Sequence, residues 1–148
     1  MEFDDKQVVR QIEKLAQQIS DTEIAWGKTH VKLINKLQSL ADLFFLVGRY
    51  ADAEPLYRRL VDIKVLHLGE RHPDTVLGIV DLADVFQAQH RNDEASKYYS
   101  CATRILIEAA NELGGISPVL ATAGMKLLEC KVPLPISMPA KVAVASSK

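Results

Sequence analysis

The stretch HLGERHPDTV, residues 67–76, gathers the side chains that could do chemistry. His67, Glu70 and His72 are of the types that bind zinc, and a histidine near a carboxylate can also act as an acid or a base. Either role requires the groups to share one face. Here they are divided between the end of one predicted helix and a turn, and Gly69 is typical of a residue that ends a helix. We therefore predict a corner between two helices and no metal site.

The remaining reactive residues do not form a catalytic pattern. Cys101 and Cys130 have no histidine at a spacing that would suggest a nucleophile pair, and a lone cysteine in a helix usually serves as a small apolar residue. The glycine-containing stretch NELGGISPV lacks the preceding strand and the lysine of a phosphate-binding loop. The sequence thus predicts a protein that is not an enzyme and holds no cofactor.

Composition narrows the classes of partner. The chain has 148 residues, enough for one domain, with 18 basic and 19 acidic side chains and a net charge of −1. This balance does not favour binding to nucleic acid. The longest nearly continuous apolar run, from Leu43 to Val47, is far shorter than the roughly 20 residues that span a bilayer. Two cysteines and no secretion signal favour a reducing compartment, so we expect a cytoplasmic protein without a membrane partner.

An internal repeat indicates the architecture. Residues 37–63 align without gaps to residues 79–105, at a period of 42 residues, and 8 of the 27 pairs are identical. Most of the other pairs at apolar positions exchange one apolar residue for another. The identical pairs are Leu40/Leu82, Ala41/Ala83, Asp42/Asp84, Phe44/Phe86, Arg49/Arg91, Ala53/Ala95, Tyr57/Tyr99 and Ile63/Ile105.

Each copy is predicted to form two helices. In the first copy Leu37, Leu40, Ala41 and Phe44 are spaced as one face of a helix, and a turn containing Gly48 follows. A second apolar stripe then begins at a small alanine, which allows two helices to approach closely. The second copy repeats both patterns. The sequence therefore predicts two helical hairpins stacked in series. The second stripes are Ala53, Leu56, Tyr57, Leu60 and Ile63, and Ala95, Tyr98, Tyr99, Ala102 and Ile105.

The small and aromatic spacing of Ala41, Phe44, Ala53 and Tyr57 resembles the tetratricopeptide repeat. The 42-residue period, with LGERHPDTV between the copies, is similar to the longer variant found in kinesin light chains. This resemblance implies an all-α fold, a short right-handed solenoid of antiparallel hairpins. It also implies a scaffold that binds a protein or peptide, without identifying the partner.

The predicted boundaries follow from these patterns. Residues 1–130 form one helical-repeat domain, followed by a flexible tail with three prolines at 131–148. We expect Trp26 to fill the junction between the first helix and the first hairpin. Within the domain we expect an N-terminal helix at 4–25, with a possible kink near Ser20, a first repeat at 30–68, a second at 73–110 and a capping helix at 117–130.

The first helix of each hairpin is expected to line a concave groove, as such repeats imply. The kinesin light chain variant usually carries an asparagine at the positions of Ser39 and Asp81, so ligand contact here is expected to depend on charge and apolar pockets. An alternative is that Asp42 and Asp84 are solvated helix residues and Phe45 packs against the next turn. The predicted binding residues are Asn35, Gln38, Ser39, Asp42, Phe45, Leu46, Leu77, Val80, Asp81, Asp84 and Gln87.

This mixture of acidic and apolar side chains predicts the chemistry of the partner. A basic and apolar segment of another protein would complement it. The alternative is a homo-oligomer, in which Phe45 and Leu46 are buried against a second copy of the chain. Both functions place the interaction in the same groove.

Overall fold

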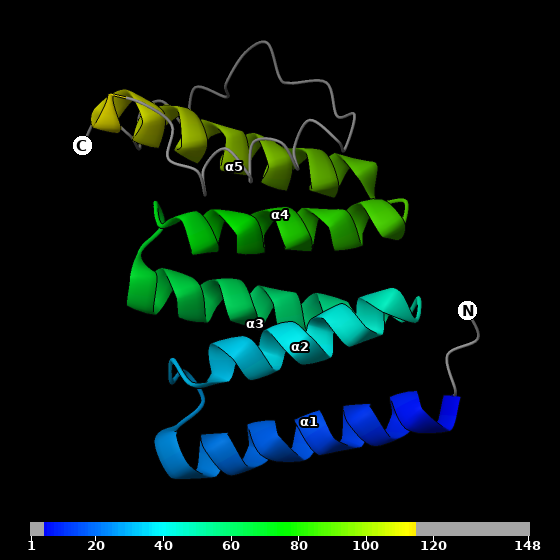
Figure 1. Cartoon of the computed structure of the whole chain (residues 1–148). Coiled ribbons are helices and arrows are strands. Elements are labelled where there is room, and N and C mark those ends of the chain that lie inside the picture. The colour runs from blue at the N-terminus through cyan, green and yellow to red at the C-terminus, as the bar shows by residue number, and fades with distance from the viewer. Residues whose placement is uncertain (1–4, 115–148) are drawn as a thin grey trace.

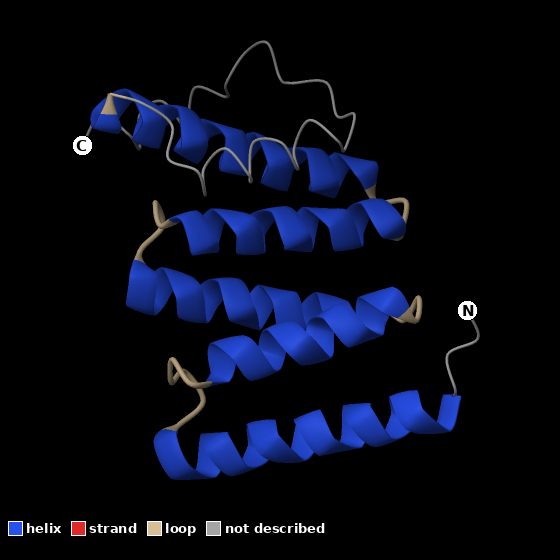
Figure 2. Cartoon of the chain, viewed as in Figure 1, coloured by secondary structure: helices blue, strands red, loops and turns tan. Residues whose placement is uncertain are grey.

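The structure is a computed structural model that describes residues 5–114, and this part of the chain is a stack of helices (Figure 1). Within it every regular element is a helix and there is no strand (Figure 2). Each helix packs against the next one along the chain. The prediction of an all-α helical-repeat fold is confirmed. The helices are α1 (Asp5–Trp26), α2 (Leu33–Leu46), α3 (Tyr50–Leu68), α4 (Pro73–Ala88) and α5 (Asn92–Leu113).

The predicted apolar stripes are the faces that α2 to α5 bury. Ala53 and Ala95, which open the second stripe of each hairpin, are 0% and 2% exposed. Phe86 is fully buried, and Phe44 packs against the core from a partly buried position. Burying each large apolar side chain of these stripes contributes roughly 1.5–3 kcal/mol to stability. The buried stripe residues are Leu37, Leu40, Ala41, Ala53, Tyr57, Leu60, Ile63, Ile79, Leu82, Ala83, Phe86, Ala95, Tyr99, Ala102 and Ile105.

The turns within the two hairpins have the same backbone shape. Gly48 has a φ of 79°, and His90, at the equivalent position of the second hairpin, has a φ of 59°. The next residue in each turn, Arg49 or Arg91, directly precedes a helix. The two arginines have nearly equal ψ angles, 62° at Arg49 and 64° at Arg91. Glycine adopts a positive φ without steric cost, whereas histidine does not. The second hairpin therefore keeps this turn at the expense of local strain.

The two turn arginines also make equivalent contacts. The Nε of Arg49 lies 2.8 Å from an Asp52 carboxylate oxygen, and the Nε of Arg91 lies 2.7 Å from one of Glu94. Each guanidinium also lies over the ring of the phenylalanine five residues earlier, at 4.8 Å for Arg49 and 4.5 Å for Arg91. These contacts join the two helices of each hairpin at its turn.

The corner between the hairpins engages the side chains of the HLGERHPDTV stretch in structural contacts. Gly69, with a φ of 91°, follows the last residue of α3, and its carbonyl accepts a hydrogen bond of 2.8 Å from the Thr75 hydroxyl. The His72 ring caps α4 by accepting from the Asp74 backbone N–H at 3.1 Å. A ring nitrogen of His67 lies 2.6 Å from the Thr29 carbonyl. The histidines of this stretch thus point to different neighbours.

α1 packs against α2 at the N-terminal end of the stack (Figure 1). It is one uninterrupted helix, with Ile19 and Thr22 buried. The expectation that Trp26 fills the junction to the first hairpin is wrong, because its side chain is 56% exposed. The Trp26 ring contacts the His30 ring and the Lys32 ammonium at the surface of this junction, and polar contacts of Arg59 lie beside it. The Arg59 guanidinium donates to the Lys28 carbonyl at 2.7 Å and pairs with Glu23 at 2.5 Å.

Two sequence predictions fall on the C-terminal part of the chain. The capping helix at 117–130 and the tail at 131–148 both lie outside the described residues. Among residues 5–114, none of the helices combines the length and the apolar character that crossing a membrane would require.

Candidate binding groove

Helix α4 presents only a narrow strip to solvent because α3 and α5 cover its flanks. Asp81 and Asp84 lie on this strip and are partly exposed. Val80, predicted to line the groove, is fully buried, so that prediction is wrong. Successive side chains of a helix point about 100° apart around its axis. Val80 precedes Asp81, so it points away from the exposed strip and into the core. The buried residues of α4 are Thr75, Val76, Gly78, Ile79, Val80, Leu82, Ala83, Val85 and Phe86.

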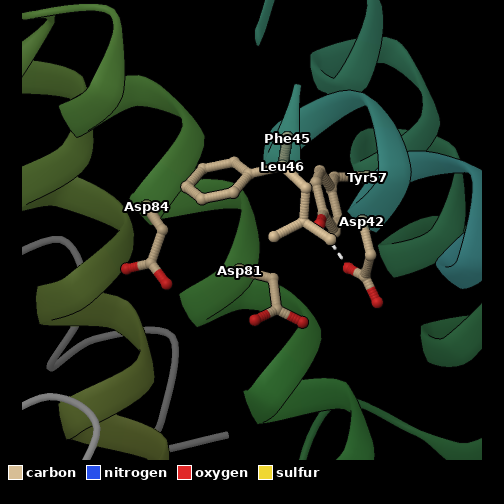
Figure 3. Close-up of a pocket in the computed structure, with 6 residues that line it drawn as sticks. All are labelled: Asp42, Phe45, Leu46, Tyr57, Asp81 and Asp84. Atoms are coloured by element: carbon tan, nitrogen blue, oxygen red, sulfur yellow. Dashed lines mark hydrogen bonds between the residues drawn. The ribbon is translucent and has the colours of Figure 1, made fainter. Parts of the chain in front are cut away.

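A pocket of about 230 Å³ opens where α2, α3 and α4 meet. Figure 3 shows three carboxylates around it, with Asp81 between the other two, and two apolar side chains above them. Five of its six lining residues were predicted from the sequence as binding residues. The lining residues are Asp42, Phe45, Leu46, Tyr57, Asp81 and Asp84.

Two tyrosine–aspartate pairs orient the carboxylates at the two ends of the pocket. The Tyr57 hydroxyl donates to Asp42 (Figure 3), and the Tyr99 hydroxyl donates to Asp84. Both tyrosines are buried, at 3% and 2% exposure. Burial raises the pKa of Tyr57, and the hydrogen bond to Asp42 raises it further. The hydroxyl therefore stays protonated at neutral pH and remains a donor to the carboxylate.

A polar network joins the floor of the pocket to a buried lysine. The Gln38 amide nitrogen donates to Asp42 at 2.8 Å and to Asp81 at 3.3 Å, so it links α2 to α4. The Gln38 amide oxygen accepts from the Lys64 ammonium at 3.4 Å. Lys64 is 7% exposed, and burial lowers its pKa although the nearby aspartates oppose this shift. The network places one positive charge behind the three carboxylates.

Gly78 on α4 lies beside this lysine and beside Val61 of α3. A Cβ atom at Gly78 would lie 3.5 Å from the Cδ of Lys64 and 3.7 Å from its Nζ. It would also lie 3.3 Å from a methyl group of Val61, which is a tight contact. The contact that a side chain at this position would strain is therefore the one with Val61, whereas Lys64 lies at ordinary van der Waals distance.

The apolar part of the pocket comes from the C-terminal end of α2. Leu46 is 67% exposed, which is high for a leucine at the mouth of a pocket. Phe45 is partly buried and meets the ring of Tyr50 edge-on, with 5.2 Å between the ring centroids. Phe45 therefore packs within the fold, as one alternative predicted, and still contributes to the pocket wall.

The other predicted binding residues lie outside the pocket lining. Asn35 and Ser39 are exposed on α2. Leu77 is partly buried against the core. Gln87, near the end of α4, accepts a hydrogen bond of 3.0 Å from the Tyr99 hydroxyl. The structure thus concentrates the candidate site at the centre of the predicted surface.

The site includes polar residues that the sequence analysis did not assign to it. Tyr57 and Tyr99 were interpreted as packing residues, and Lys64 was not singled out. The two tyrosines could have been found, because an identical aspartate and an identical tyrosine recur in both copies with the same spacing of 15 residues. Lys64 lies four residues after Leu60 and so continues the apolar stripe of α3. A charged residue at such a position indicates a buried polar contact.

The pocket combines negative charge with an apolar wall. Within residues 5–114, no three or more histidine, cysteine, aspartate or glutamate side chains are placed to hold one metal ion. The three pocket carboxylates come from two repeats and surround an opening with an apolar wall. Such a surface attracts basic side chains by charge and can bury apolar ones beside them.

Comparisons with known proteins agree with the helical repeat. The family model for the tetratricopeptide repeat matches residues 32–108, which is more than half of the chain. A protein of Hyaloscypha variabilis, named nucleotide-binding leucine-rich repeat (NLR)-like protein, is 40% identical to this chain over 40 residues. These residues make up 27% of this chain and 4% of that protein, so the chain spans a small fraction of its relative's length. Domains built from this repeat generally mediate protein interactions and are generally not enzymes.

Proposed function

From the premise that this chain belongs to the tetratricopeptide repeat family, we propose that it is an interaction scaffold. It binds a short basic and apolar segment of a partner protein in the groove between α2 and α4. This groove is the surface around the pocket that Asp42, Phe45, Leu46, Tyr57, Asp81 and Asp84 line. The observation that carries this proposal is the pocket itself, in which Asp42, Asp81 and Asp84 surround an opening beside exposed Leu46. The 42-residue period supports assigning the chain to the longer, kinesin-light-chain-like variant.

Charge would draw the segment to the groove, and apolar contact would hold it. A basic side chain gains from three carboxylates on one rim, although Lys64 offsets part of their charge. An apolar side chain next to it can cover Leu46 and the exposed part of Phe45. Because the two hydroxyl bonds hold Asp42 and Asp84 in fixed orientations, these carboxylates lose little freedom on binding.

The test compares two double variants of equal net charge. Asp42→Asn with Asp84→Asn removes two charges from the groove, but each asparagine oxygen still accepts from its tyrosine. Asp62→Asn with Asp93→Asn removes two charges from exposed positions on α3 and α5 outside the pocket. The probe is a short fluorescent peptide of alternating arginine and leucine. Fluorescence anisotropy gives its dissociation constant with each protein.

We expect the groove variant to bind the probe on the order of tenfold more weakly than the wild type, since it loses two charge pairs that are each worth roughly 0.5–1 kcal/mol near a protein surface. The control variant should bind like the wild type. Raising the salt from about 0.05 to 0.5 M should weaken wild-type binding through screening. Equal loss in both variants would mean that the peptide responds to net charge and not to this groove.

A second function is favoured by the exposure of Leu46, which is 67%. Two copies of the chain could bury this residue and Phe45 against each other, as in a homo-oligomer. Sedimentation velocity of the wild type and of Leu46→Gln distinguishes this function from the first. A dimer that the substitution dissociates would support oligomerisation, whereas a monomer at all concentrations would contradict it.

A further inference from the structure

The sequence that follows residue 130 has the charge and the apolar content that would complement the groove. Residues 131–148 read KVPLPISMPAKVAVASSK, with three lysines and no acidic residue. The groove presents carboxylates beside Leu46 and Phe45. The segment therefore matches, in charge and in apolar content, the ligand expected from the proposed function. Its larger apolar residues are Val132, Leu134, Ile136, Met138, Val142 and Val144.

Prolines prepare this segment for a groove. Pro133, Pro135 and Pro139 fix one backbone dihedral each and bias the preceding residue toward an extended conformation. A segment whose backbone dihedrals are restricted by prolines loses less conformational entropy on binding than an unrestricted one. The composition thus favours binding as an extended strand of chain along the surface.

The described chain ends close to the start of α4. Arg71, which precedes α4, pairs with Glu112 in the last turn of α5 and lies 3.7 Å from a carboxylate oxygen of Glu108. Helices α4 and α5 lie side by side in Figure 1. Asp81 is two turns along α4 from Asp74, which is about 10 Å. The segment that follows Gly114 therefore starts a short distance from the carboxylates.

The intervening residues are long enough to bring the segment to the groove. Residues 115–130 would span about 24 Å even if they were entirely helical, and more if extended. Both values exceed the roughly 10 Å along α4. A tethered segment within reach acts at an effective concentration on the order of millimolar. Even a weak contact would then be occupied for much of the time.

We propose that residues 131–148 bind in the groove of their own chain and compete there with the partner segment. This proposal rests on the proposed function, since it uses the same pocket. The lysines meet Asp42, Asp81 and Asp84, and the apolar residues cover Leu46. A partner must displace the segment before it binds, so the groove is available only to ligands that bind more tightly than the tethered segment or reach a high concentration.

The experiment uses the full chain in three forms. One is the wild type, one carries Lys131→Glu, Lys141→Glu and Lys148→Glu, and the control carries arginine at the same three positions. The probe is a fluorescent synthetic peptide with the sequence of residues 131–148, added in solution and followed by anisotropy. The glutamate variant should bind this probe on the order of two- to tenfold more tightly than the wild type. The arginine variant should bind it like the wild type.

The outcomes separate this proposal from the proposed function. Equal affinity of all three forms, with loss of binding in the Asp42→Asn and Asp84→Asn variant, would overturn tail docking and leave the groove as a peptide site. If the arginine–leucine peptide binds and the 131–148 peptide does not, tail docking is also overturned. Binding of neither peptide overturns both. A dimer in sedimentation that the glutamate variant abolishes would overturn the assignment to the same chain, because the segment would then occupy a second copy.

Discussion

In the first hairpin Tyr57 donates its hydroxyl to Asp42, and in the second hairpin Tyr99 donates to Asp84. All four residues are conserved between the copies at the 42-residue period. The turn arginines and their acidic partners recur in the same way. The residues that the two hairpins share therefore hold each hairpin together and orient one carboxylate toward the groove.

The hairpins differ where they meet each other. Gln38 of the first hairpin corresponds to buried Val80 of the second, and Lys64 corresponds to partly buried Leu106. Asp81 occurs where the first hairpin has Ser39. The residues that differ build the polar network of Gln38, Asp81 and Lys64 across the seam between repeats. The shared residues thus specify the fold and supply two of the three groove carboxylates, and the differing ones add Asp81 and Lys64, which carry opposite charges.

The largest expected effect comes from the shared tyrosines. Tyr57→Phe and Tyr99→Phe each remove a buried hydrogen bond to a carboxylate, and each should lower the free energy of unfolding by about 1–2 kcal/mol. Urea denaturation followed by circular dichroism measures both. Tyr98→Phe is the control, because within residues 5–114 its hydroxyl has only a long, exposed contact of 3.4 Å with Arg58, and the change should alter stability by less than about 0.5 kcal/mol. Markedly unequal losses in the first two variants would break the equivalence of the hairpins.

The Tyr57 pair also predicts a pH dependence. Burial raises the pKa of Tyr57 in the folded chain above the ordinary value near 10. The unfolded chain therefore loses this proton first as the pH rises, and the contribution of Tyr57 to stability, complete below about pH 10, declines above it. The difference in stability between the wild type and Tyr57→Phe should narrow from pH 9 to about pH 11. A constant or widening difference would contradict the assigned donor role.

An intermediate effect is expected at the seam. Lys64→Leu introduces the residue that the second hairpin has at this position, and it removes the positive charge behind the groove carboxylates. Affinity for the arginine–leucine peptide should rise by roughly two- to fivefold, since a like charge near the ligand is lost. Lys14→Leu, at an exposed position on α1, is the control for total charge. Equal gains in the two variants would show that Lys64 has no specific influence on the groove.

The smallest effect is expected at the turns. His90→Gly gives the second hairpin the glycine that the first has at Gly48, and it relieves the positive φ of 59°. Stability should rise by about 0.5 kcal/mol, because the relief of strain exceeds the entropy that glycine adds to the unfolded chain. Thermal unfolding would detect this as a small increase in melting temperature. A decrease would mean that the histidine side chain makes a stabilising contact at this turn.

The hairpins could be predicted because their determinants are local and repeated. The spacing of Leu37, Leu40 and Ala41 follows from the period of the helix, and a shift of 42 residues finds the same stripe in the second copy. Asp42 and Asp84 were predicted as groove residues for the same reason. Tyr57 and Tyr99 could have been assigned to the site, since they recur with the aspartates that they contact.

The sequence by itself determined the helices, their pairing into hairpins and the helix faces that become buried, because neighbours in a helix are neighbours in the chain. Only the tertiary structure decided that Val80 is buried while Leu46 is exposed. It also decided that Gln38 meets Asp81 and Lys64, which lie 43 and 26 residues away on other helices. Such contacts depend on how close α2, α3 and α4 come at their crossing, and at Gly78 a Cβ atom would lie only 3.3 Å from a methyl group of Val61 on α3. Spacing along one helix does not encode the distance between helices, so the charge balance of the groove emerges only when they pack.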